Sequence, residues 1–307
     1  MGLAAAPARA HKRVMIASAD TAALTERAPA KINLSLRVLG RRADGYHDLA
    51  SLVAFAGTGD RLTLVPGEAF GLDMTGPRAA GLSAEPDNLV LKAARELAAR
   101  VPGLAAGRFR LDKRLPVASG IGGGSADAAA GLRLLARRNG LGLDDPRLFA
   151  AALATGSDVP ACLYSRACVM TGRGEGLAPL ALPRFGAVLV NPGVAVATAA
   201  VFRALALAPG TRLAEAARPG GFADRHAVLD FLAGAPNDLQ PPAFALVPVL
   251  ATVEAALKAT PDALLVRMSG SGATMFALYE DCRTAARAAK MVTRLHPDWW
   301  VKSTVLG

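Results

Sequence analysis

Residues 116–132, PVASGIGGGSADAAAGL, join a proline and a short apolar pair to a glycine-rich loop and then to an alanine-rich segment. Glycine allows positive φ and lets a ligand come close to the main chain. A helix after such a loop directs its free N–H groups and the positive end of its dipole back into the loop, an arrangement that binds phosphate in many proteins. We predict this helix over residues 126–138, with Ser125 as its N-cap. The stretch has neither the Lys-Ser/Thr pair of the P-loop nor the G-x-G-x-x-G spacing, so a flexible turn before a core helix stays open as the alternative.

Length and composition indicate a soluble globular protein. The 307 residues fit one large or two ordinary domains, and the 52% hydrophobic and 20% charged residues are typical of a chain that buries a core. The formal net charge is +10, but aromatic residues make up only 5%, too few for an obvious base-stacking platform. We therefore expect no nucleic-acid partner, because a general basic bias or a polyanionic small substrate explains the charge equally well.

Cysteine usage and the apolar segments favour the cytoplasm. The three cysteines form no C-x-x-C pair, so neither a disulfide framework nor a zinc site is expected. The amino terminus lacks the pattern of a signal peptide. One uncharged run, residues 185–202, reaches the length of a membrane span, but Asn191-Pro192-Gly193 interrupts it and its valine spacing suits two strands. We expect no membrane association.

Hydrophobic periodicity predicts a mixture of strands and helices with no internal repeat. Residues 1–25 have no clear period and are expected to form a loose extension, and residues 32–38 alternate as a half-buried strand does. Further strands are expected at 61–65, 109–112, 168–170, 185–190, 194–196, 264–268 and 274–279, and further helices at 87–100, 146–154, 198–206, 224–233, 243–258 and 283–295. A domain boundary is expected near residues 180–184.

Three more features suggest chemistry. Lys31 stands at the head of an apolar strand, where it is either a buried cation that needs an anionic partner or an ordinary solvated strand end. Asp158 lies in the turn GSDVP, where its carboxylate either serves as a general base toward an alcohol or closes the turn. Residues 268–274, MSGSGAT, form a second Gly/Ser loop that either presents N–H groups to a phosphate or makes a plain hairpin.

In their order along the chain, these stretches resemble the signature blocks of the GHMP superfamily, which comprises galactokinase, homoserine kinase, mevalonate kinase and phosphomevalonate kinase. The blocks are PAKINLSL at 29–36, the stretch at 116–132, and MSGSGATMFAL at 268–278. Within the superfamily, the details resemble the kinases of 4-diphosphocytidyl-2-C-methyl-D-erythritol. The segments that carry this likeness are PAKINL at 29–34, RRADGYHDL at 41–49, GSDVP at 156–160, GRGE at 172–175, NPG at 191–193 and NDL at 237–239.

The resemblance implies an α+β fold in two halves with the active site in the cleft between them. The amino-terminal half, residues 26–182, would be a ribosomal-protein-S5-like domain, and residues 183–307 would be a ferredoxin-like split β-α-β domain. The implied reaction transfers the γ-phosphoryl group of ATP to the 2-hydroxyl of the cytidine diphosphate-alcohol substrate, in the methylerythritol phosphate pathway to isoprenoid precursors. Mg²⁺ would be carried on ATP, and no protein metal ligand is expected.

The resemblance also implies the catalytic and ATP-binding residues. Asp158 would accept or orient the proton of the substrate hydroxyl, and Lys31 would hold Asp158 ionised beside the transferred group. The nucleotide phosphates would lie against one continuous run: Pro116, Val117, Ala118, Ser119, Gly120, Ile121, Gly122, Gly123, Gly124, Ser125 and Ala126.

For the substrate, the resemblance implies a cytosine stacked between Tyr46 and Phe202, each of which offers the face of an aromatic ring. His47 would read the edge of the cytosine, and Asn33 and Thr198 would contact the diphosphate or the erythritol end.

Three other functions stay open at this stage. Another GHMP small-molecule kinase, of the homoserine or mevalonate type, would not need the motif at residues 44–47. A non-catalytic ligand-binding relative would be expected to lack Lys31 or Asp158. An RNA-binding protein would show basic stripes and interleaved aromatics, which the sequence lacks. We expect the protein to act as a monomer or weak homodimer.

Overall fold

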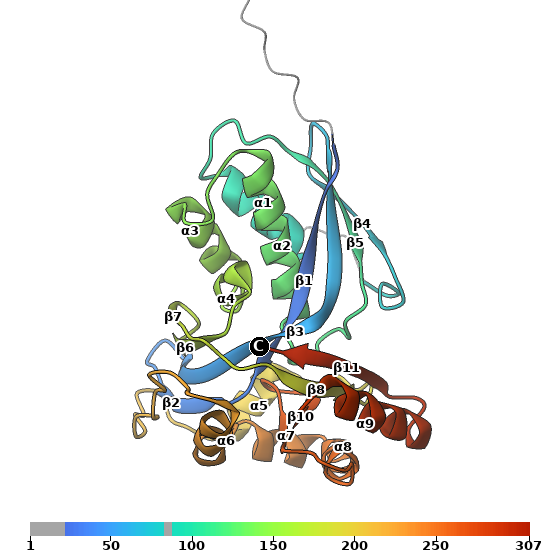
Figure 1. The fold of residues 1–307 in the computed structure, drawn as a ribbon. Helices are drawn as coiled ribbons and strands as arrows, with labels where there is room; N and C mark the ends of the chain where they lie inside the picture. The colour runs from blue at the N-terminus through green and yellow to red at the C-terminus, as the bar shows by residue number, and fades with distance from the viewer. Residues whose placement is uncertain (1–21, 83–87) are drawn as a thin grey trace, which may run out of the picture.

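One long strand connects the two halves of the molecule. The computed structural model describes residues 22–82 and 88–307, and in it β3 (His47–Pro66) runs from one half into the other (Figure 1). Within the described part, β3 pairs antiparallel with five strands. They are β1 (Leu24–Asn33), β2 (Arg37–Arg41), β5 (Gly107–Asp112), β6 (Cys168–Gly172) and β11 (Trp300–Leu306).

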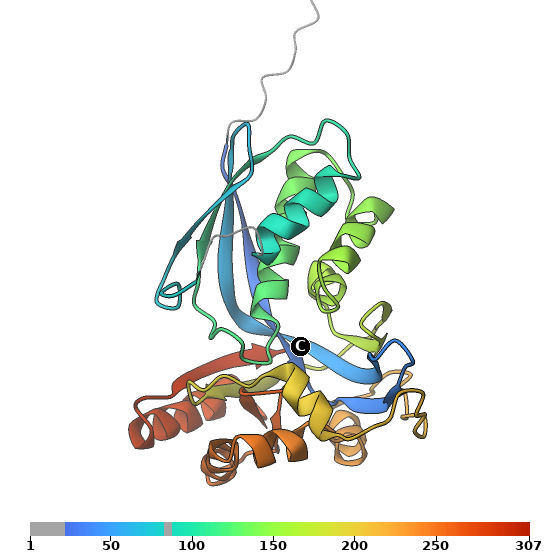
Figure 2. The same cartoon turned by 180° about the vertical axis from the view of Figure 1, so that it is seen from behind.

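The amino-terminal half is a sheet with helices on one face only (Figures 1 and 2). Strand β5 shows why: Phe109 and Leu111 are buried under the helices, whereas Arg108 and Arg110 point to the open face, as the period of two requires. The remaining elements of this half are β4 (Gly71–Thr75), which runs parallel to β5, β7 (Gly176–Pro179), and the helices α1 (Leu89–Ala98), α2 (Gly123–Arg138), α3 (Pro146–Thr155) and α4 (Val159–Tyr164).

The carboxy-terminal half is an antiparallel sheet in the order β11-β8-β10-β9. Its central strand β8 is buried along its whole length, because Val188 and Val190 face one hydrophobic core while Ala187 and Leu189 face another. The elements are β8 (Phe185–Asn191), β9 (Leu265–Met268), β10 (Met275–Tyr279), α5 (Thr198–Ala204), α6 (Arg225–Gly234), α7 (Gln240–Leu246), α8 (Val249–Lys258) and α9 (Cys282–Leu295). No helix in the described residues has the length and apolar character of a membrane span.

Most of the predicted elements are confirmed, and the errors have local causes. The expected helix at 243–258 is two helices, because Pro248 lacks an N–H and holds Val247 in an extended conformation. The expected strand at 194–196 is wrong: after Asn191 the chain turns and runs along the cleft toward α5. Strand β1 begins at Leu24, inside the expected extension, of which residues 1–21 lie outside the described part.

Candidate active site

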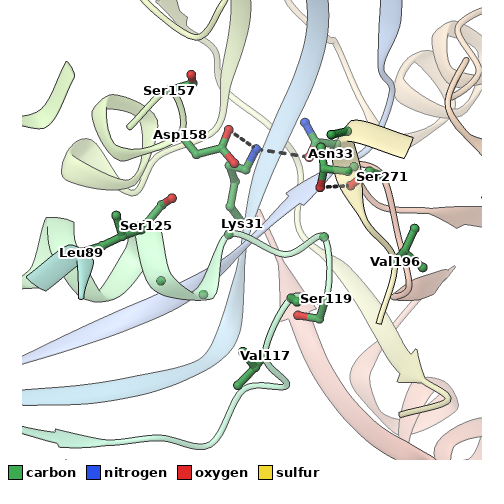
Figure 3. A pocket seen from close by; sticks show the side chains of 18 of the residues that line it. Lys31, Asn33, Leu89, Val117, Ser119, Ser125, Ser157, Asp158, Val196 and Ser271 are labelled. Carbon is green, nitrogen blue, oxygen red and sulfur yellow. Dashed lines mark hydrogen bonds and ion pairs between the residues drawn. The ribbon is translucent and has the colours of Figure 1, made fainter. Parts of the chain in front are cut away.

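A cleft of about 1200 Å³ lies between the two halves. Of the residues predicted for the site, only Ile121 and Ala126 do not line it, since both are buried in the core. The predicted residues at the cleft are Lys31, Asn33, Tyr46, His47, Pro116, Val117, Ala118, Ser119, Gly120, Gly122, Gly123, Gly124, Ser125, Asp158, Thr198 and Phe202. The fold therefore brings together residues from both ends of the chain, as Figure 3 shows for ten labelled positions.

The glycine loop, residues 116–124, ends in a helix start that differs from the prediction. Helix α2 begins at Gly123 with Gly122 as its N-cap, at φ 63°, so the expectation that Ser125 caps the helix is wrong. The first intrahelical bond runs from the N–H of Ala126 to the Gly122 oxygen, at 2.8 Å. The N–H groups of Gly123, Gly124 and Ser125 precede it and have no intrahelical partner. They give the loop the properties of an anion site.

The second Gly/Ser loop, residues 268–274, packs against the glycine loop. It is the turn between β9 and β10, as in a hairpin, but its backbone touches the other loop directly. The Thr274 N–H donates to the Ser119 oxygen at 3.0 Å, and the Ser269 hydroxyl donates to the Gly120 oxygen at 3.0 Å. The two loops therefore hold each other in place across the two halves.

Lys31 and Asp158, 127 residues apart in the sequence, form an ion pair in the cleft (Figure 3). Lys31 is 3% exposed, and its Nζ lies 2.7 Å from Asp158 Oδ1. Asp158 is the N-cap of α4, but its side chain accepts no capping hydrogen bond, which argues against the alternative in which it only closes the turn. Its carboxylate is 36% exposed. The pair thus combines a buried cation with a carboxylate that a ligand can reach.

Asn33 orients Lys31. Its Oδ1 accepts from Lys31 Nζ at 3.2 Å, and its Nδ2 donates to the Ser51 hydroxyl at 2.7 Å. The Ser51 hydroxyl in turn donates to the Ser35 oxygen. The amide therefore cannot flip without losing both bonds, and Lys31 Nζ is directed at Asp158.

Another part of the cleft lining is aromatic and basic. His47 stacks on Phe202, with ring centroids 4.7 Å apart, and the Arg173 guanidinium lies 3.7 Å from the centroid of the Tyr46 ring. Burial and the nearby Arg41 lower the pKa of His47, which favours the neutral ring near pH 7. Tyr46 and Phe202 are thus each covered on one face by another side chain of the protein.

Thr198, the first residue of α5, shares a hydrogen bond of 2.8 Å with the Ser271 hydroxyl. Its position at the cleft agrees with the prediction, although its hydroxyl is shared with the second Gly/Ser loop. Val196 and Ser271 lie on one side of the cleft (Figure 3), and Thr198 also lines it.

Both sequence and structure comparisons agree with this geometry. Residues 88–166 match the family described as "GHMP kinases N terminal domain", and residues 222–298 match "GHMP kinases C terminal". A protein of Xanthobacter autotrophicus named 4-diphosphocytidyl-2-C-methyl-D-erythritol kinase is 61% identical over 91% of this chain and 98% of that protein. The chain belongs to the 4-diphosphocytidyl-2-C-methyl-D-erythritol kinases. A kinase of the same name from Methylobacterium radiotolerans is 58% identical over 92% of this chain and 99% of that protein.

Solved structures confirm the α+β GHMP fold of this kinase. A crystal structure of a 4-(cytidine 5'-diphospho)-2C-methyl-D-erythritol kinase superposes with a TM-score of 0.74 at 36% identity, covering 92% of this chain and 99% of that one. A homoserine kinase from Cytophaga hutchinsonii has the same fold, with a TM-score of 0.66 at 18% identity and coverage of 93% of this chain and 94% of that one. The family is one of ATP-dependent small-molecule kinases, as predicted. The assignment of individual residues to ATP and substrate stays a prediction.

Sequence reasoning missed a buried ionic cluster of three residues in this kinase, two of which, Lys113 and Asp127, line the cleft. Lys113 Nζ lies 2.5 Å from Asp60 Oδ2 and 2.7 Å from Asp127 Oδ2, and all three residues are buried. Asp60 Oδ1 also accepts from the N–H groups of Arg114 and Leu115, which lead into the glycine loop. No local sequence pattern could predict this cluster, because its three residues come from β3, α2 and the segment after β5.

We expect the free energy of unfolding to depend on pH through the carboxyl of Asp127. Burial raises the pKa of Asp127 from 3.8 to about 7, so the folded state holds this proton more tightly than the unfolded state. The protonated Asp127 carboxyl stabilises the folded state fully below pH 3.8, and this stabilisation is lost as the pH rises to about 7. The stability of wild type relative to Asp127→Asn should therefore fall between pH 5 and pH 8 in thermal unfolding.

Asp60→Asn is the matched comparison. It weakens the ion pair with Lys113 and two backbone hydrogen bonds, so it should destabilise the protein by about 3 kcal/mol. A constant difference between wild type and Asp127→Asn across that range would contradict the proposed titration.

Proposed function

We propose that this kinase transfers the γ-phosphoryl group of ATP to the 2-hydroxyl of 4-diphosphocytidyl-2-C-methyl-D-erythritol, in the methylerythritol phosphate pathway. The observation that carries the proposal is the Lys31–Asp158 pair, which lies in one cleft with the free N–H groups of the glycine loop. Relatives with the corresponding name at 55–61% identity support the choice of substrate.

Asp158 is the group that accepts or orients the proton of the attacking hydroxyl. Its exposed carboxylate, free of any capping role, is available to a substrate alcohol. Lys31 pairs directly with that carboxylate and places a positive charge beside it. A Cβ added to Gly122 would lie 3.4 Å from Lys31 Cε, so the lysine stem passes directly beside the loop and its charge lies near the transferred group.

The glycine loop fits ATP. The N–H groups at residues 123–125 have no partner within the helix and are available to phosphate oxygens, and these residues line the cleft. Mg²⁺ would enter the site bound to the phosphates of the nucleotide. When bound, it would neutralise charge on those phosphates. The protein's own part is to position the phosphates and to stabilise charge through Lys31.

The aromatic end of the cleft suits cytosine. Tyr46 is exposed and Phe202 lines the cleft, so we expect a base to stack on these rings. Arg41, Arg173 and Arg203 also line the cleft and supply positive charge for a diphosphate. We expect His47, Asn33 and Thr198 to contact the substrate as well.

The test is ADP release by the purified protein with Mg-ATP and one of three alcohols: 4-diphosphocytidyl-2-C-methyl-D-erythritol, homoserine or mevalonate. We expect turnover with the cytidine substrate alone. Turnover with homoserine or mevalonate alone would overturn the assigned substrate, while the assignment as a kinase would stand. We further expect activity as a monomer or weak homodimer in the cytoplasm.

A further inference from the structure

A second cavity lies on the open face of the amino-terminal sheet. It has a volume of about 820 Å³ and is lined mainly by residues of β1, β3 and β11. None of the residues that the structure describes lines both this cavity and the active-site cleft. We call it the basic groove, and it is lined by Arg27, Gly57, Thr58, Gly59, Asp60, Arg61, Pro77, Arg78, Arg114, Cys282, Trp300, Lys302, Ser303, Thr304 and Val305.

The charge of the basic groove is strongly one-sided. Five of its lining residues are cationic, and Asp60 is the single acidic residue among the described ones that line it. The Asp60 carboxylate is fully buried and is already paired with Lys113. Arg61, Arg78 and Lys302 have no side-chain hydrogen bond or ion pair in the described part of the protein. Arg61 lies opposite Asp112 of β5, but the Asp112 carboxylate is already paired with Arg114.

Strand register places like charges directly opposite each other in this groove. Arg27 on β1 is the antiparallel partner of Arg61 on β3, so both side chains lie on the same face of the sheet. Such a pair destabilises a sheet. The Arg27 guanidinium donates to the Gly57 oxygen, but no carboxylate separates it from Arg61. A bound anion would remove this repulsion.

We propose that the basic groove binds a small anion with at least two adjacent phosphates. Guanidinium groups bind phosphate oxygens in a bidentate manner, and Arg61, Arg78 and Lys302 come from different segments around the groove. A volume of about 820 Å³ exceeds the needs of a single orthophosphate. Free pyrophosphate and the phosphate chain of a nucleotide share this chemistry.

The two tryptophans of the chain allow a direct test. They are the consecutive residues Trp299 and Trp300, and Trp300 lines the basic groove. In a Trp299→Phe background, the fluorescence of Trp300 would be followed while orthophosphate, pyrophosphate, ATP or a short single-stranded oligonucleotide is added at 0.15 M salt. We expect a saturable change in fluorescence with pyrophosphate or with ATP. The one that binds with the higher affinity identifies the source of the phosphates.

Two variants inside the basic groove are compared with one control variant outside it. Arg61→Gln and Lys302→Gln should each weaken binding by about tenfold or more, the cost of a charge-assisted hydrogen bond. Arg110→Gln removes an exposed cation from the same open face outside the groove and should leave binding within about twofold. The three variants should remain folded and keep the wild-type ADP-release rate. No saturable change with pyrophosphate or ATP, binding of the oligonucleotide alone, or equal weakening by Arg110→Gln would overturn the proposal.

Discussion

Replacing Asp158 with Asn should lower kcat by about 10³-fold, the usual contribution of a positioned general base. The amide keeps an oxygen toward Lys31 Nζ but loses the charge and the basicity that a hydroxyl proton needs. The affinity for ATP should stay within about threefold, because the triphosphate is held by the N–H groups after Gly122 and gains slightly from the loss of a nearby negative charge. Single-turnover kinetics and equilibrium nucleotide binding would be measured on the same preparation.

Asp145→Asn is the matched control, since Asp145 is the N-cap of the neighbouring helix α3 and its side chain accepts from the Arg147 N–H. Asn caps a helix about as well as Asp, so this variant should keep kcat. If Asp158→Asn retained more than about a tenth of the wild-type rate, Asp158 would not be the catalytic group that general-base catalysis requires.

Local chemistry explains why much of the site could be predicted from the sequence. The glycine loop, Lys31 and the turn at residues 156–160 each need a particular residue type at a fixed local spacing, so each is visible in one stretch of chain. That Lys31 meets Asp158 follows from no spacing in this chain: it depends on β1, α2 and α4 packing together, and only the resemblance to a family implied it.

Features that depend on packing between distant segments could not be predicted. The sequence pattern predicted a strand only at residues 61–65, because glycines interrupt the apolar pattern before it, yet β3 runs as one strand from His47 to Pro66. Arg173 covers Tyr46, and Asp127 meets Lys113, through contacts that no local pattern encodes. The start of α2 was placed wrongly because Ser125 is a strong N-cap type, whereas the left-handed conformation of Gly122 decides where the helix begins.

Gly120→Ala should destabilise the protein by about 3 kcal/mol or more and abolish tight ATP binding. Gly120 has φ 73°, and a Cβ there would lie 2.6 Å from the backbone oxygens of both Ser269 and Gly272. Neither oxygen can move independently, because the Ser119 oxygen and the Ser269 hydroxyl already fix the two loops to each other. The loops must therefore separate, which displaces the free N–H groups that follow Gly122.

Gly140→Ala isolates the part of this cost that comes from the backbone alone. Gly140 has φ 64°, close to that of Gly120, but a Cβ there would meet nothing within 4 Å. Its substitution should cost about 1 kcal/mol through the left-handed conformation, with ATP affinity unchanged. Denaturant unfolding and nucleotide titration of both variants would measure the difference. Equal losses of stability in the two variants would mean that the loops can separate at no cost, and the contact between residues 116–124 and 268–274 would then not be what positions the phosphates.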